Sequence, residues 1–97
     1  MANLSFSLSD QPLGAGFAHV VEFEATKSFN LHIERNGKGS FNLAQKSIQN
    51  GKYATIKGAN YDLEEVIDTF VEVPLAPMYF RIQSETMPTM AVVIFAE

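Results

Sequence analysis

Apolar and polar residues alternate with a period of two along most of this chain of 97 residues. Successive side chains of a β-strand point to opposite faces of a sheet, so this spacing is typical of strands with one dry face and one wetter face. The segment SFNLHIER shows it clearly, with Phe29, Leu31 and Ile33 on one face. Strand signals of this kind occur at residues 4–8, 17–25, 29–36, 40–47, 53–57, 67–73, 78–84 and 90–96.

The motif Ser-Phe-Asn-Leu occurs twice, with an Asn-Gly pair between the two copies. Asn-Gly favours the centre of a two-residue turn, and that turn alone would pair Ile33 with Ser40. One extra residue at Gly39, as a bulge or within a three-residue loop, pairs Ile33 with Leu43 and keeps the apolar faces in phase. The repeat therefore predicts the two arms of a β-hairpin rather than a recognition motif.

One segment, NYDLEEVIDTF, has helical spacing. Leu63, Val66, Ile67 and Phe70 fit an i, i+3, i+4, i+7 pattern, and Asp62 can cap the first turn. The same stretch also alternates toward its end. We expect a short helical turn that runs into a strand.

About eight short strands separated by glycine and proline predict an antiparallel β-sandwich or jelly-roll-like barrel with one short helical turn. A chain of 97 residues is long enough for one domain, so residues 1–97 are expected to form a single all-β domain. A second Asn-Gly pair, Asn50-Gly51, is expected to join the strands at 40–47 and 53–57.

Composition excludes several functions. Because cysteine is absent, the chain has no disulfide, no thiolate metal site and no cysteine nucleophile. Seven scattered Lys and Arg residues and a net charge of −4 make nucleic acid an unexpected partner. No apolar run is long enough to span a membrane, so no membrane partner is expected. The N-terminal MANLSFSLSD lacks the basic and apolar regions of a signal peptide, and we expect synthesis in the cytoplasm.

Titratable residues give weak signals for chemistry. His19 and His32 are the two histidines, and a metal site would need a further ligand such as Glu22 or Glu34. No close-spaced ligand pair stands out, so no metal and no cofactor is predicted. Glu22 and Glu24 share one face of a strand, where a solvated pair is commoner than a catalytic pair. We therefore expect no enzymatic activity.

Aromatic residues suggest an alternative. Tyr53, Tyr61 and Tyr79, with neighbouring phenylalanines, could form a stacking platform for sugars, although the chain has no tryptophan. The alternative function is thus a small ligand-binding module, with carbohydrate as the expected ligand.

The C-terminal segment MAVVIFAE is apolar on both faces. A strand that is dry on both faces is covered twice, and a second subunit is one way to cover the outer side. The even-numbered side, with Val92 and Ile94, is a β-branched set suited to a core, so we assign the odd-numbered side to a subunit interface. The predicted interface residues are Ala91, Val93, Phe95, Val71, Val73 and Leu75.

These features favour a non-enzymatic structural module that forms a homo-oligomer. The charged fraction of 19% is low, which agrees with surface covered by a partner. Small all-β chains without cysteine are common among phage virion components such as capsid decoration, head-fibre and tail proteins. By this analogy of fold we expect a virion protein whose partners are itself and other virion proteins.

Overall fold

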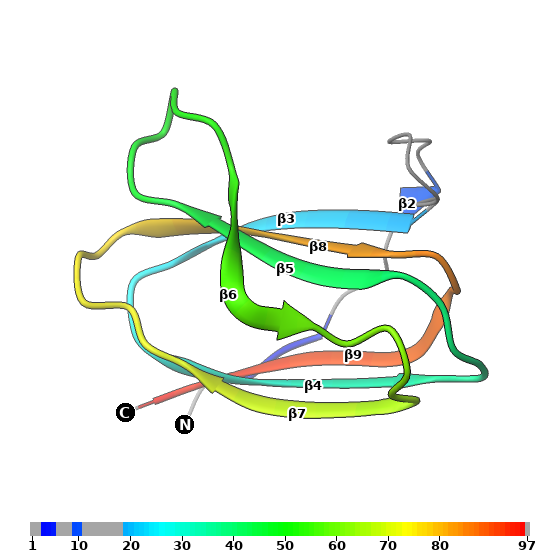
Figure 1. Cartoon of the computed structure of the whole chain (residues 1–97). Coiled ribbons are helices and arrows are strands. Elements are labelled where there is room, and N and C mark those ends of the chain that lie inside the picture. Colours follow the sequence, from blue (N-terminus) through cyan, green and yellow to red (C-terminus); the bar gives the residue numbers. More distant parts are fainter. Residues whose placement is uncertain (1–2, 6–8, 11–18, 97) are drawn as a thin grey trace.

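The computed structural model describes residues 3–5, 9–10 and 19–96 (Figure 1). In this part of the chain, nine strands form two antiparallel sheets and no helix is present. The strands are β1 (Asn3–Ser5), β2 (Ser9–Asp10), β3 (His19–Ala25), β4 (Phe29–Arg35), β5 (Phe41–Lys46), β6 (Ala54–Asn60), β7 (Val66–Val71), β8 (Met78–Ser84) and β9 (Pro88–Phe95). The predicted all-β class is confirmed.

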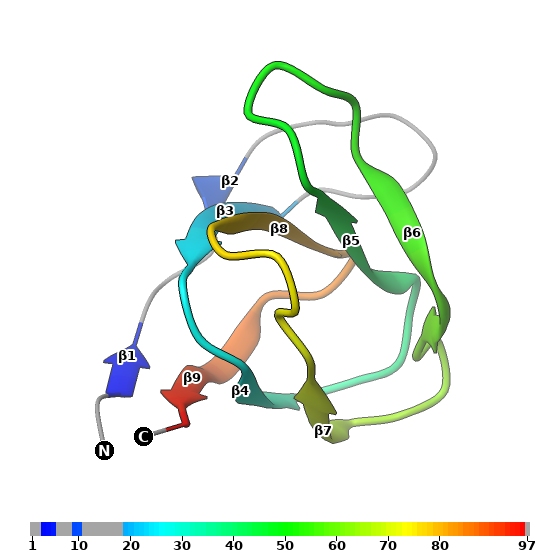
Figure 2. The ribbon, with the colours of Figure 1, turned by 90° about the vertical axis from the view of Figure 1, so that its left-hand side faces the viewer.

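The two sheets pack face to face in a β-sandwich-like arrangement (Figures 1 and 2). One sheet has the strand order β1-β9-β4-β7, and the other has the order β2-β3-β8-β5-β6. Aromatic rings join the layers: the Phe29 ring of β4 lies edge-on to Phe80 of β8, with centroids 5.0 Å apart, and to Phe23 of β3, at 5.5 Å. The dry faces expected from the alternation thus meet in one core.

Strand β4 runs through the middle of its sheet. Leu31 lies opposite Thr69 of β7 and Val93 of β9. Ile33 lies opposite Ile67 of β7 and Ala91 of β9. Phe29, Leu31 and Ile33 are fully buried, as their alternation predicted. Burial of each such aliphatic or aromatic side chain stabilises the fold by roughly 1.5–3 kcal/mol.

The predicted hairpin between the two Ser-Phe-Asn-Leu copies is wrong. Strand β4 belongs to the four-stranded sheet and β5 to the five-stranded sheet, so residues 36–40 cross from one layer to the other. In a hairpin, the apolar residues of both arms must point to the same side. Two strands that cover one core from opposite layers must likewise point their apolar residues at that core, so the alternation fits both arrangements. The crossing is held by backbone bonds from Gly39 N–H to the Asp62 carbonyl (3.0 Å) and from Glu85 N–H to the Ser40 carbonyl (2.8 Å). A side chain at Gly39 would collide with that of Glu85.

The predicted connection of β5 and β6 through Asn50-Gly51 is confirmed, with a turn over residues 48–51. Strand β5 pairs with β6 in an antiparallel hairpin, and Gly51 N–H donates to the Ile48 carbonyl at 2.9 Å in the connection between them. The turn signal and the strand pairing agree here because both arms belong to one sheet.

The predicted helical turn is also wrong. Residues 66–71 form strand β7, which pairs with β4 along its whole length. The Asp62 carboxylate accepts a hydrogen bond from Phe41 N–H of β5 (3.0 Å) instead of capping a helix. Of the four apolar residues with helical spacing, only Ile67 is buried. Pairing with β4 therefore prevails over the local helical signal.

Candidate functional site

The face of β9 that the sequence assigned to a subunit contact lies inside the molecule. Ala91 and Val93 are 6% and 0% exposed, and Phe95 packs against the core with its ring centroid 6.1 Å from that of Phe29. The register corrects the assignment, because the odd-numbered residues of β9 lie beside the inward residues of β4. Of the other predicted interface residues, Val71 and Val73 are also in the core, whereas Leu75 is exposed.

The opposite side of this sheet carries an exposed face of mixed character. Its outward residues, called the outer face below, are Met90, Val92 and Ile94 on β9, Asn30, His32 and Glu34 on β4, and Val66, Asp68 and Phe70 on β7. Met90, Val66 and Phe70 are 46%, 58% and 59% exposed. Apolar side chains on the two flanking strands thus border a polar row on the central strand.

A histidine joined to two carboxylates forms the centre of the outer face. Nε2 of His32 lies 2.8 Å from Oε2 of Glu34, and Nδ1 lies 3.0 Å from Oδ2 of Asp68. The hydrogen bonds with Glu34 and Asp68 raise the pKa of His32 above its ordinary value. Asn30 donates to the other oxygen of Asp68, and this bond and the one with His32 lower the pKa of Asp68. The cluster is therefore satisfied within one chain.

The two histidines considered for metal binding do not come together. His32 lies on the four-stranded sheet, whereas His19 lies on β3 of the other sheet, opposite Ser84. Within residues 3–5, 9–10 and 19–96, no group of three or more histidine, aspartate and glutamate side chains is arranged to hold a metal ion.

The outward side of the five-stranded sheet carries a second charged cluster. Glu22 and Glu24 of β3 lie opposite Arg81 and Tyr79 of β8, and both carboxylates are exposed. Tyr53 leans over this side, with the Arg81 guanidinium carbon 4.7 Å from its ring centroid. Burial and a hydrogen bond with Glu22 raise the pKa of Tyr53 to about 12. The two glutamates thus support a polar surface and do not face each other across a cleft.

Of the three tyrosines of the predicted sugar platform, Tyr61 lies apart from the other two. The Lys46 ammonium lies between Tyr53 and Tyr79, 4.5 Å and 5.8 Å from their ring centroids. Tyr61 packs instead against Phe41 beside the core, with ring centroids 6.0 Å apart. The three rings do not share one surface, and two cations, Lys46 and Arg81, lie over the Tyr53 ring.

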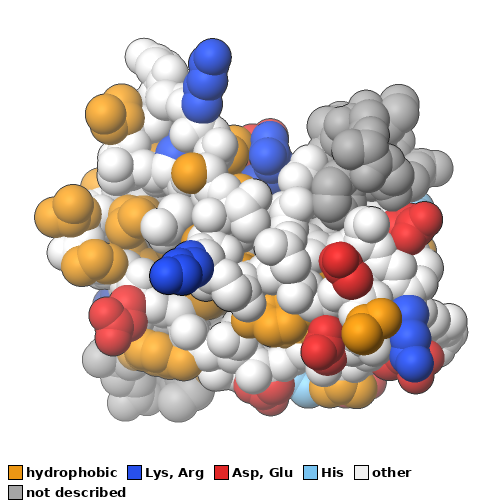
Figure 3. Space-filling view, in the orientation of Figure 1, with side chains coloured by type: hydrophobic (Ala, Val, Ile, Leu, Met, Phe, Trp, Pro, Cys, Tyr) orange, Lys and Arg blue, Asp and Glu red, His pale blue; other side chains and the backbone are white. Residues whose placement is uncertain are grey.

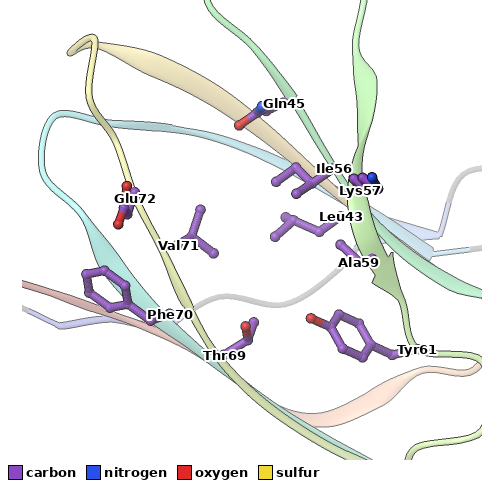
Figure 4. Close-up of a pocket in the computed structure, with 11 residues that line it drawn as sticks. Leu43, Gln45, Ile56, Lys57, Ala59, Tyr61, Thr69, Phe70, Val71 and Glu72 are labelled. Carbon is purple, nitrogen blue, oxygen red and sulfur yellow. The ribbon is translucent and has the colours of Figure 1, made fainter.

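A groove opens between the free edges of the two sheets, where β6 faces β7 (Figure 4). Strand β6 pairs with β5 at Thr55 and again at Asn60, and the residues between them arch away from β5. Gly58, with a φ of +79°, supplies the left-handed conformation that the arch requires. The resulting β6–β7 groove has a volume of about 310 Å³ and is lined by Leu43, Gln45, Ile56, Lys57, Gly58, Ala59, Tyr61, Thr69, Phe70, Val71 and Glu72.

The groove has an apolar floor and a polar rim. Leu43, Ala59 and Val71 belong to the core and form its base, while the side chains of Lys57 and Glu72 lie on opposite sides of it (Figure 4). In Figure 3, hydrophobic side chains reach the surface on this side of the molecule, among scattered charged ones. The sequence contained no direct signal for this groove except Gly58, because the arch depends on how β6 pairs with β5.

Arg35 is the residue whose importance sequence reasoning missed. It ends β4, is only 4% exposed, and its guanidinium donates to the carbonyls of Gly39 (3.1 Å), Tyr61 (2.9 Å) and Glu64 (2.6 Å). Burial lowers its pKa, against the opposing effect of nearby carboxylates, of which Asp62 acts most strongly. Arg35 thus ties the β4–β5 crossing to the β6–β7 connection.

No family model matches the chain, and the comparisons with curated proteins and with solved structures found no significant similarity either. No helix in the described ranges is long and apolar enough to cross a membrane. The functional proposal therefore rests on the surfaces described above.

Proposed function

We propose that the chain is a non-enzymatic assembly module that forms a homo-oligomer through the outer face of its four-stranded sheet. The observation that carries the proposal is the exposure of Met90, Val66 and Phe70 on a regular sheet surface. Monomeric proteins normally keep the outward face of a sandwich polar, and exposed apolar residues on both sides of a polar row are more typical of an interaction site.

The polar row of the outer face is compatible with burial in a contact. Burying a polar group costs free energy unless its hydrogen bonds are made. Both ring nitrogens of His32 already have carboxylate partners, and Asp68 also accepts from Asn30. A second copy would therefore need to supply apolar contact and few new hydrogen bonds. A closed oligomer in which the outer faces of two copies meet follows the usual symmetry of homo-oligomers.

The biological setting of the proposal is a phage virion, as a capsid decoration, head-fibre or tail protein, with other virion proteins as further partners. Its support is the all-β sandwich-like fold of a small chain without cysteine, which is an argument from fold alone. The non-enzymatic part of the proposal is supported by the exposed position of Glu22 and Glu24 on an open sheet surface.

Charge substitutions on the two sides of the sandwich test the proposal. We expect Met90→Glu and Val92→Glu to shift the oligomer to monomer, because each places a carboxylate inside an apolar contact. The matched control is Thr55→Glu, which adds the same charge at an exposed position of the other sheet. Light scattering after size exclusion gives the mass, and far-UV circular dichroism gives the fold. An oligomer that survives both outer-face substitutions with an intact fold would contradict the proposal.

A further inference from the structure

The free edge of β7 is an unprotected strand edge beside a groove. Strand β7 ends the order of its sheet and pairs only with β4 among the strands described. Natural proteins usually protect such edges with charges or proline. The one charged residue of β7 is Asp68, and its carboxylate is bound by Asn30 and His32 of β4, away from the free edge. Its exposed neighbours Val66 and Phe70 are apolar.

The opposite wall of the groove is set back from this edge. Strand β6 leaves β5 after Thr55 and returns at Asn60, and the β6–β7 groove opens beside the C-terminal half of β7, from Thr69 to Glu72. Thr69 and Val71, which point inward from β7, line the groove together with Ile56 of the arch. A strand placed along β7 would therefore find hydrogen-bonding groups on one side and an apolar recess for its side chains opposite Thr69 and Val71.

We propose that the β6–β7 groove binds an extended polypeptide segment of a partner, which adds to the four-stranded sheet as a strand next to β7. Main-chain hydrogen bonds then provide affinity, and the recess selects small aliphatic residues at alternate positions. At about 3.4 Å per residue, a segment of about six residues matches the length of β7. This inference is independent of the outer-face contact, because it uses the edge of the sheet and not its face.

The charges at the two ends of β7 favour a basic segment. Glu65 directly precedes β7 and Glu72 directly follows it, and both are exposed, whereas Lys57 stands on the arch across the groove (Figure 4). A segment antiparallel to β7 starts beside Glu72 and ends beside Glu65, so basic residues at both of its ends complement the rim.

Two synthetic heptapeptides are the probes. Both carry the core Val-Thr-Val-Thr-Val, which points its valines inward when the first residue of the probe lies opposite Glu72; the first has lysine at both ends, and the second has glutamate at both ends. In titrations followed by amide NMR, the first probe is expected to shift and protect the amides of Val66–Val71 and to shift those of the arch around Gly58. The acidic probe is expected to bind about three- to tenfold more weakly, since exposed charge pairs contribute modestly.

Reversal of one rim charge makes the test sharper. Glu72 is exposed, so Glu72→Lys should leave the fold intact and reduce the preference for the basic probe. Glu24→Lys adds the same charge on the other sheet and should leave the preference as in the wild type.

Three results would overturn the inference. They are the absence of shifts at β7 with millimolar probe, equal binding of both probes by wild type and Glu72→Lys, and shifts of groove amides with neutral oligosaccharides but not with peptides. The last result would assign the groove to carbohydrate.

Discussion

The buried guanidinium of Arg35 offers the sharpest test of how the crossing between the sheets is held. Replacing Arg35 with methionine keeps most of the apolar stem and removes every donor. Three carbonyls, those of Gly39, Tyr61 and Glu64, then lose a charged partner. The hydroxyls of Ser84 and Thr86, each 3.5 Å from Nη1, are weaker partners.

The size of the effect follows from these bonds. Hydrogen bonds to a charged group contribute about 1.5–3 kcal/mol each, and the cost of burying the guanidinium offsets part of that sum. We therefore expect Arg35→Met to lower the free energy of unfolding by about 3 to 5 kcal/mol, a large fraction of the total for a small domain. Arg35→Lys should recover only part of the loss, because one ammonium group cannot reach all three carbonyls.

Equilibrium urea unfolding followed by circular dichroism measures this difference. Lys38→Met is the control, since Lys38 is an exposed residue of the same crossing and its replacement should change stability by less than about 0.5 kcal/mol. A loss below about 1 kcal/mol for Arg35→Met would refute the reasoning, because it would mean that water replaces the guanidinium at little cost.

Four further predictions address the fold and the surfaces. Because the pKa of His32 is raised above 6.5, its stabilising contribution is complete below that pH and is lost as the pH rises through the folded-state pKa; His32→Gln should therefore cost more stability at pH 5 than at pH 8.5, and equal costs in urea melts would contradict the cluster. Val93→Glu should unfold the chain, as judged by circular dichroism, because Val93 is fully buried; a folded variant would contradict the register of β9. Gly58→Ala should lower stability by about 1–2 kcal/mol in the same melts through backbone strain alone, since a Cβ there meets no atom within 4 Å, and an unchanged midpoint would mean a different arch. Glu22→Gln with Glu24→Gln should leave the mass and the fold unchanged; hydrolysis of a glycan or ester panel by the wild type but not by this double variant would show that the chain is an enzyme.

Alternation predicted which residues face inward within each strand, and not which strands are neighbours. Phe29, Leu31 and Ile33 were placed correctly because a strand has only two faces. Arg35 follows the same spacing, so its inward position was available from the sequence, but its charge argued for the surface. The carbonyls that bind it come from connections whose approach depends on the whole fold.

Pairing between strands explains the errors. In both a hairpin and a crossing between layers, the apolar residues of the two strands point to one core. The Asn-Gly signal before Gly39 occurs in either kind of connection and does not distinguish them. On β9, both faces are apolar. The β-branched residues Val92 and Ile94 favoured the even-numbered face for the core, and that assignment was wrong. The register with β4 decides it, because Val93 lies directly beside Leu31. The β6–β7 groove was not predicted, because the arch forms only where β6 does not pair with β5, and strand pairing cannot be deduced from the alternation.

The mass of the wild-type protein in solution, measured by light scattering over a wide range of concentration, tests the central claim most directly. One chain has a mass of 10.7 kDa. Assembly through the outer face predicts a particle of two or more chains that dissociates only on dilution. A mass of one chain at every concentration, up to the millimolar range, would contradict it.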